Sequence, residues 1–501
     1  MARLKSIVLS ALVGVSLLLS AELWLVGTPG LVVNDTPYAA PIRFDRERDP
    51  LVLAQPTAIG VADGDRRWLI APEASEATAV WAWVRGLEVD RMQSPEAIAE
   101  GDARKTDAAG GRGSEEPADP GQNGPSAKTA LWLSWPSGLP ANVWQALFPT
   151  WPKPSLSAVD ALWVEREGSA LRAVVYAVSE GRKQAIDLLA PQDGAIDAWR
   201  DVIDVATPTA DGAPSVPPHR IPVATGKDAP ETVTPAPEAE ASVREPALEA
   251  FWRPLPEAGS ALPTYVLRLQ PIDAESAAEA LITDVTAMRQ ARERDGSRLF
   301  TDGARSLRID ERAGMLEYFA PVTGPVRPMP ENAYETAVQF VNRHAGWTGE
   351  FRLAAARESA AEVQFAFHLA VDGWPVLDGA PSVYLLSVGV QGRSVVSYER
   401  GLYRPLGMDE DGARLLPDAR DVARALQAMG RPASDVARIQ VAYAAQPTRT
   451  AGVFRLVPGL YVALGDGAAR FLTVADELTP AGGEDAAGAP KTRTGEGGGQ
   501  R

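Results

Sequence analysis

The sequence predicts an α+β protein, with one N-terminal transmembrane helix followed by about three extracytoplasmic domains of antiparallel sheets with packed helices. Three observations lead to this class. One long apolar run occupies residues 7–26, helical and strand-like patterns alternate after it, and stretches rich in Pro, Gly, Ala and Glu separate the patterned regions. The length of 501 residues also exceeds what a single hydrophobic core organises.

The apolar run, Ile7 to Val26, is long enough to span a bilayer, because a helix of that length at about 1.5 Å per residue covers about 30 Å. Arg3 and Lys5 precede it, and no further Lys or Arg occurs before Arg43. The positive-inside rule therefore places residues 1–27 as a cytoplasmic tip and a single-pass helix in the cell membrane, with the rest of the chain outside. The rival interpretation is a cleaved signal peptide, although the candidate cleavage sites have Leu where a small residue is expected.

Small residues recur at every fourth position of this helix, at Ser6, Ser10 and Gly14. Such spacing makes a shallow groove where a second helix can approach closely, and it predicts a contact with partner helices in the membrane. The alternative is that these residues have no role, since Ser and Gly are common in membrane helices.

Composition divides the chain after the anchor. Segments poor in aromatic residues and rich in Pro, Gly, Ala and Glu bury too little apolar surface to offset chain entropy, so we expect them to be unfolded. The predicted parts are an N-terminal α+β domain at 40–205 with a disordered insertion at about 93–128, a linker at 206–248, a central α+β domain at 249–327, a C-terminal α+β domain at 328–476 and a disordered tail at 477–501.

Apolar periodicity predicts helices and strands in these domains. We expect Asp273 to be a helix N-cap and Gly346 to end a helix in the left-handed conformation. Strand-like alternation is clearest from Val363 to Leu369. The predicted helical stripes are Ala77, Val80, Trp81 and Val84; Ala277, Ala280, Leu281 and Val285; Tyr334, Ala337, Val338 and Val341; and Val422, Ala425, Leu426 and Met429.

Charge and composition exclude several functions. The net charge of −16 disfavours nucleic-acid binding, and the absence of cysteine excludes disulfides and thiolate metal sites. Of the three histidines, His219 lies in a spacer, and His344 lies in the last turn of a predicted helix, where an imidazolium suits the dipole. His368 alternates onto the face opposite the apolar residues of its strand, where we expect solvent. No zinc, P-loop or nucleophile-elbow motif occurs, so we predict no catalytic residue, no metal and no cofactor.

One segment, residues 297–321, carries a recognisable combination of residues and resembles the YycH family. The matching positions that we take as structural are Phe300, Asp302, Gly303, Arg305, Gly314, Glu317 and Tyr318. The anchor, the segment at 66–89 and the segments at 333–353 and 395–407 add weaker likeness in the same order. Within the motif, Asp302-Gly303 is predicted to form a turn that enters a strand, in preference to a phosphate or metal loop.

The resemblance implies an extracytoplasmic regulatory protein of Gram-positive bacteria. It implies partners, namely a WalK-like sensor histidine kinase and a YycI-like membrane protein, and a role in cell-wall homeostasis through that two-component system. The alternative is a cell-envelope binding module with a peptidoglycan or protease partner, which would expose aromatic residues. The tryptophans lie mostly in apolar patterns, however, and we expect Trp81, Trp132, Trp163 and Trp347 in the core.

Overall fold

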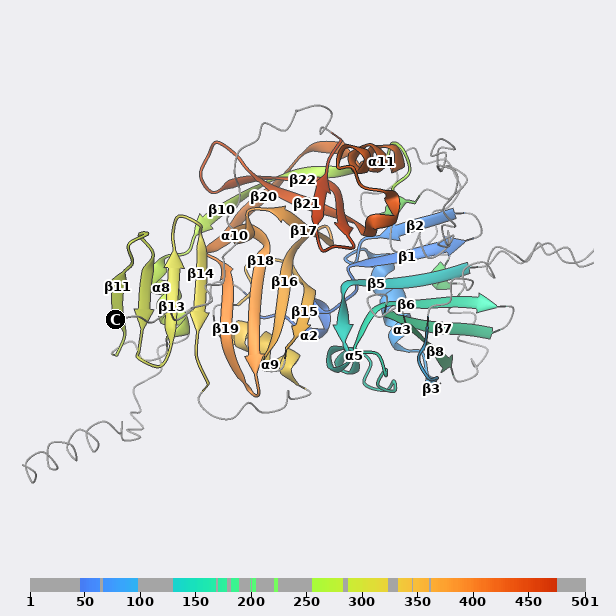
Figure 1. Ribbon diagram of the computed structural model, residues 1–501, viewed down its shortest axis with the longest axis horizontal. Helices are drawn as coiled ribbons and strands as arrows, with labels where there is room; N and C mark the ends of the chain where they lie inside the picture. Colours follow the sequence, from blue (N-terminus) through green and yellow to red (C-terminus); the bar gives the residue numbers. More distant parts are fainter. Residues whose placement is uncertain are drawn as a thin grey trace, which may run out of the picture. The chain divides into compact units, whose positions relative to one another are not determined.

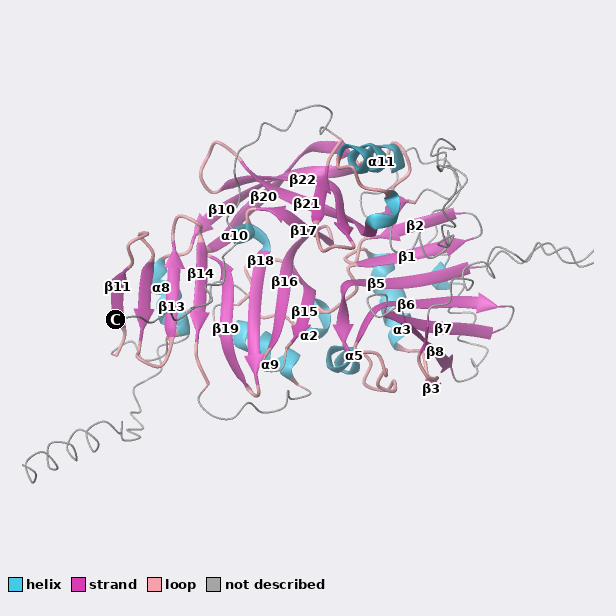
Figure 2. Cartoon of the chain, in the orientation of Figure 1, coloured by secondary structure: helices cyan, strands magenta, loops and turns pink. Residues whose placement is uncertain are grey.

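Antiparallel sheet with a few packed helices makes up most of the structure, a computed structural model (Figure 2). It describes residues 46–63, 66–97, 129–167, 170–177, 182–188, 199, 201–203, 220–223, 255–282, 287–322, 332–344, 346–359 and 362–474. The α+β class is confirmed. The helix predicted at 7–26 lies outside these residues, and no helix within them is both long and apolar enough to cross a membrane.

The first sheet has the strand order β3-β8-β7-β6-β5-β1-β2-β9, with β4 beside β8 (Figure 1). Its strands are β1 (Ala58–Asp63), β2 (Arg66–Ile70), β3 (Val89–Met92), β4 (Glu96–Ala97), β5 (Thr129–Pro140), β6 (Ala158–Glu167), β7 (Ala170–Ala177), β8 (Arg182–Leu188) and β9 (Arg220–Pro222). The helices of this part are α3 (Ser75–Arg85) and α5 (Ala141–Leu147). The predicted stripe on α3 is confirmed, because Ala77, Val80, Trp81 and Val84 are its buried residues.

Aromatic side chains fill the core between α3, α5 and this sheet. Trp81 meets Trp135 and Phe148 edge-on, and Trp144 packs against Phe148 with ring centroids 4.3 Å apart. Trp132 is buried and stacks on the partly buried Trp163. Trp81, Trp132 and Trp347 are therefore confirmed as buried residues, whereas Trp163 is only partly buried.

The second sheet has the order β11-β12-β13-β14-β19-β18-β16-β17-β21-β22-β10-β20, with β15 beside β16 and β23 beside β22. Its strands are β10 (Ala261–Pro271), β11 (Arg289–Arg292), β12 (Arg298–Thr301), β13 (Ser306–Asp310), β14 (Met315–Phe319), β15 (Phe351–Glu358), β16 (Val363–Val371), β17 (Trp374–Gly379), β18 (Leu385–Gln391), β19 (Ser394–Gly401), β20 (Tyr403–Leu415), β21 (Val436–Pro447), β22 (Val453–Leu464) and β23 (Ala469–Leu472). Its pairs are antiparallel except β17 with β21.

Four α-helices and one 3-10 turn accompany this sheet in the described residues: α8 (Ala274–Leu281), α9 (Ala333–Arg343), α10 (Pro381–Tyr384), α11 (Ala419–Ala428) and η2 (Ala433–Asp435). Asp273 caps α8 by accepting a hydrogen bond from the Ser276 amide, as predicted. Gly346 adopts φ +74° after α9, and its amide donates to the Val341 carbonyl, which confirms the predicted helix end. The stripe on α9 is confirmed as its buried face.

Strands from the predicted central and C-terminal domains pair with each other. β14 pairs with β19, and β10 pairs with both β20 and β22. The two regions therefore share one hydrogen-bonded sheet, while the boundary near residue 327 stays a prediction.

The first described segment, which ends in α2 (Pro50–Leu53), is held by residues from the C-terminal part of the chain. The Asn342 side chain exchanges hydrogen bonds with both backbone groups of Arg48. The Tyr334 hydroxyl donates to the Pro50 carbonyl at 2.7 Å, and Arg352 donates to the Val52 carbonyl at 3.0 Å. The chain therefore passes over α9 and β15 before it enters the first sheet.

Candidate interaction surface

The residues described by the structure contain no group of three or more side chains that could hold a metal ion. Two of the three histidines can be placed, and His219 lies outside the described residues. The His344 ring stacks on Phe340, and its burial lowers its pKa. Desolvation therefore opposes the imidazolium expected at this helix end, and it outweighs the favourable backbone contact to Phe340.

The solvent-facing position expected for His368 is also wrong. Its ring meets Tyr384 of α10 edge-on at 5.3 Å, and its Nδ1 is shielded from solvent without a hydrogen-bond partner. This burial lowers the pKa of His368 to about 4, so the ring is neutral at pH 7. His368 lies on the side of β16 opposite Phe365 and Phe367, as the alternation predicts, but α10 covers that side of the strand.

Within the motif segment, residues 302–305 form the turn between β12 and β13. The Asp302 carboxylate accepts hydrogen bonds from the amides of Ala304 and Arg305, at 2.9 and 2.7 Å. The Thr301 hydroxyl closes the turn by donating to the Arg305 carbonyl at 2.6 Å, and Gly303 takes φ +90°. The predicted turn is confirmed, and its carboxylate is engaged by the backbone of the chain itself.

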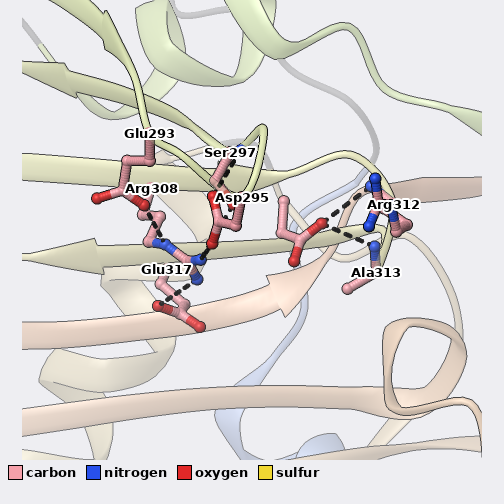
Figure 3. A network of polar contacts seen from close by, with 8 residues as sticks. Glu293, Asp295, Ser297, Arg308, Arg312, Ala313 and Glu317 are labelled. Carbon is pink, nitrogen blue, oxygen red and sulfur yellow. Dashed lines mark hydrogen bonds and ion pairs between the residues drawn. The ribbon is translucent and has the colours of Figure 1, made fainter.

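Gly314 ends the next turn, between β13 and β14, at φ +68°. A Cβ at this position would lie 2.5 Å from the Tyr403 ring, so both the backbone conformation and the space require glycine. Asp310 starts the same turn by accepting from the amides of Arg312 and Ala313 (Figure 3). This geometry supports a structural role for Gly314.

Arg308 on β13 is the centre of a polar network (Figure 3). Its guanidinium contacts Glu293 at 2.8 Å, Asp295 at 2.6 Å and Glu317 at 3.6 Å. Hydrogen bonding to Glu293 and the nearby carboxylates raise the pKa of Arg308. One cation is thus shared by three carboxylates, so the neighbourhood keeps an excess of negative charge.

Strand register sorts the residues of β12 to β18 onto two faces, because directly paired residues point to the same side. One row consists of Phe300, Leu307, Tyr318, Tyr398, Val388 and Phe365, all buried. This inner face packs on α9 (Figure 1). On that helix, Phe340 meets both Tyr318 and Tyr398. The motif residues Phe300 and Tyr318 are therefore core residues.

The opposite side, which we call the outer face, carries two rows of a different composition. The first row is Leu299, Arg308, Glu317, Glu399, Ser387 and Ala366, and the second is Thr301, Ser306, Phe319, Ser397, Gly389 and Gln364. Most of these side chains are small or charged, and Phe319 is 54% exposed. The end of this face at Gly401 is covered by α10, since a Cβ there would strike the Ser382 carbonyl.

Two carboxylates oppose each other on the outer face. Glu317 and Glu399 are directly paired across β14 and β19. Burial, followed by the charge of Glu317, raises the pKa of Glu399. Like charges directly opposite in a sheet are destabilising, so the fold tolerates a local cost here.

Several predicted residues cannot be placed on this surface. Ser6, Ser10 and Gly14 lie outside the described residues, so the transmembrane ridge stays a prediction. Of the motif residues, Glu317 alone lies on the outer face, while the others form turns or core. The pairing of Glu317 with Glu399 was not predicted, since the two residues are far apart in the sequence and only the strand register brings them together.

The fold and this surface define a sheet-rich α+β protein with an open acidic sheet face. Residues 254–458 match the family model for the YycH protein, C-terminal domain. The crystal structure of YycH from Bacillus subtilis superposes with a TM-score of 0.58 and 12% sequence identity, covering 86% of this chain and 100% of that chain. The likeness to the YycH family that the motif indicated is thus confirmed for residues 254–458, and the structural match shows a YycH-like fold.

Two other comparisons add nothing to this assignment. An uncharacterized protein from Eubacterium rectale matches with a TM-score of 0.28 and 11% identity, over 44% of this chain and 80% of that chain. No curated protein matches the sequence at a significant level.

Proposed function

We propose that this protein is a membrane-anchored extracytoplasmic regulator of a WalK-like sensor histidine kinase. It acts by protein–protein contact with the kinase and a YycI-like membrane protein, and it tunes signalling in cell-wall homeostasis. The observation that supports this function is the match of residues 254–458 to the YycH C-terminal domain. The likeness to YycH from Bacillus subtilis, which extends over 86% of the chain, supports the same organisation beyond that domain.

The anchor takes part in this proposal. Residues 7–26 would lie in the lipid bilayer, with the N-terminus in the cytoplasm and the bulk of the chain outside. The ridge of Ser6, Ser10 and Gly14 would contact partner helices, where close approach gains packing that lipid cannot match. This assignment is supported by sequence spacing.

The test is co-purification of the tagged full-length chain from detergent-solubilised membranes. We expect the sensor kinase and the YycI-like protein to be recovered together with it. Gly14→Leu should reduce their recovery by holding the helices apart, whereas Leu18→Ile, a change of similar character off the ridge, should not. Recovery of wall fragments without the kinase would contradict the proposed function, and equal recovery of both variants would contradict the ridge.

A further inference from the structure

We propose that the outer face is a docking surface for a basic segment of a protein partner, with Glu399 receiving a Lys or Arg side chain and Phe319 packing beside it. This inference rests on the proposed function in one respect: the kinase and the YycI-like protein are the partners used to test it. The surface itself is argued from the register, burial and charge of β14, β18 and β19.

The floor of the face is flat, because small residues occupy its middle. Ser387, Ser397 and Gly389 have little or no side chain above the strands. A Cβ on Gly389 would collide with the Glu362 carboxylate, which lies over the sheet and accepts a hydrogen bond from the Ser397 hydroxyl at 3.0 Å. Glu362 therefore covers the strands at this place and adds a third carboxylate to the outer face.

The charge of the face is negative and only partly compensated. Among the described residues, no cation or hydrogen-bond donor contacts the carboxylate of Glu399, although its side chain is half-buried. Glu317 faces it directly, and the nearest guanidinium, that of Arg308, is already shared with Glu293 and Asp295. A half-buried carboxylate without a cation is costly, and a partner cation removes that cost on binding.

An exposed aromatic ring lies next to these carboxylates. Phe319 and Glu317 both project from the outer side of β14 two residues apart, about 7 Å along the strand. An aromatic ring beside a carboxylate suits a guanidinium, which can stack on the ring and pair with the acid. Aromatic anchors ringed by polar residues are also typical of the centres of protein interfaces.

The same charges argue against two other occupants. A second copy of this chain would bring Glu317 and Glu399 against identical carboxylates, which opposes association through this face. An anionic lipid surface would be repelled for the same reason. A protein segment that carries Lys or Arg is the occupant that the chemistry favours.

The test places a photo-crosslinking amino acid at Gln364, an exposed residue on the outer face, in the full-length chain expressed in cells with the kinase and the YycI-like protein. The control position is Leu406 on β20, which is 65% exposed and belongs to a strand at the far end of the sheet. We expect an adduct with one of the two proteins at position 364 and none at position 406. Charge reversal by Glu317→Lys with Glu399→Lys should reduce the adduct about tenfold.

A second variant separates docking from folding. Glu399→Gln removes the half-buried charge, so it should raise the melting temperature of the free protein while it lowers the yield of adduct. A rise in melting temperature together with a fall in adduct yield is expected only if the Glu399 carboxylate serves binding at a cost in stability. A purely structural role would lower both quantities together, and that result would overturn the proposal.

The remaining outcomes distinguish the surface from the proposed function. Co-purification with the kinase and no adduct at position 364, or an adduct unaffected by charge reversal, would overturn the docking surface and leave the function standing. Failure of co-purification, combined with a charge-dependent adduct to a different protein identified by mass spectrometry, would overturn the proposed function and support the surface.

Discussion

Replacing Arg352 by Met should destabilise the protein more than any change to an exposed ion pair. Arg352 lies on β15 with its side chain 4% exposed. Its guanidinium donates to Glu73 at 3.1 Å and to the Val52 carbonyl at 3.0 Å, so it joins three segments that are distant in sequence. Methionine keeps the apolar stem but removes both donors, and it leaves the Glu73 carboxylate without its cation.

The size of the effect follows from burial. Breaking a fully buried ion pair by removing one partner costs about 3–5 kcal/mol. The Glu73 side chain is 33% exposed, and solvent compensates part of the loss, so we expect about 2–4 kcal/mol. Burial, which outweighs the attraction of Arg352, raises the pKa of Glu73 above 4.5. The cost should therefore be largest at neutral pH and shrink as Glu73 becomes protonated at lower pH.

Urea unfolding of the protein, followed by tryptophan fluorescence, measures this cost. The matched control is Arg268→Met, because the pair of Arg268 with Asp409 has side chains 48% and 59% exposed and should be worth less than about 1 kcal/mol. Adding Glu73→Gln to Arg352→Met should recover part of the loss. Equal destabilisation by the two arginine variants, or no recovery in the double variant, would refute the reasoning.

Two further predictions concern single residues. Burial lowers the pKa of His368 to about 4, so the unfolded chain binds a proton more readily than the folded one between about pH 6.5 and 4, and stability falls as the pH drops through this window. His368→Leu should remove about 2–3 kcal/mol of the loss in free energy of unfolding between pH 7 and pH 4.5, measured by urea titrations at the two pH values. A variant whose free energy of unfolding falls as much as that of the wild type would contradict the burial argument. Gly314→Ala should cost about 2–3 kcal/mol in the same assay, because it adds a clash with Tyr403 to the strain of a positive φ. Gly303→Ala, at φ +90° with nothing within 4 Å, should cost about 1 kcal/mol, and equal costs would refute the clash.

Local patterns predicted the buried faces of α3 and α9, because helix burial follows a period that the sequence displays directly, whereas α8 ends at Leu281, before the last residue of its predicted stripe. The apolar stripes on α3 and α9 are the buried faces of those helices, and Asp273 and Gly346 end their helices as expected. These features depend on neighbours within a few residues. The same holds for the Asp302 turn, whose hydrogen bonds span two or three residues.

Features that depend on distant residues could not be predicted in this way. β20 (Tyr403–Leu415) contains Pro405, Gly407 and three consecutive acidic residues, which are depleted in strands. It is nevertheless extended along its whole length, because it pairs with β10 from far upstream in the chain. The buried pair of Glu73 with Arg352 is likewise invisible in the sequence, since its two residues are 279 positions apart.

The residues on the inner face of β12 to β19 are easier to predict from sequence than those on the outer face. On the inner face, alternation, burial and aromatic packing all agree, and the motif residues Phe300 and Tyr318 are buried there. On the outer face the same strands place Glu317 opposite Glu399 and leave Phe319 exposed, although both arrangements cost stability in the free protein. Sequences keep such local conflicts mainly where another requirement outweighs stability. The conflict is confined to one side of the sheet, and a binding partner that supplies a cation and an apolar contact would resolve both parts of it at once.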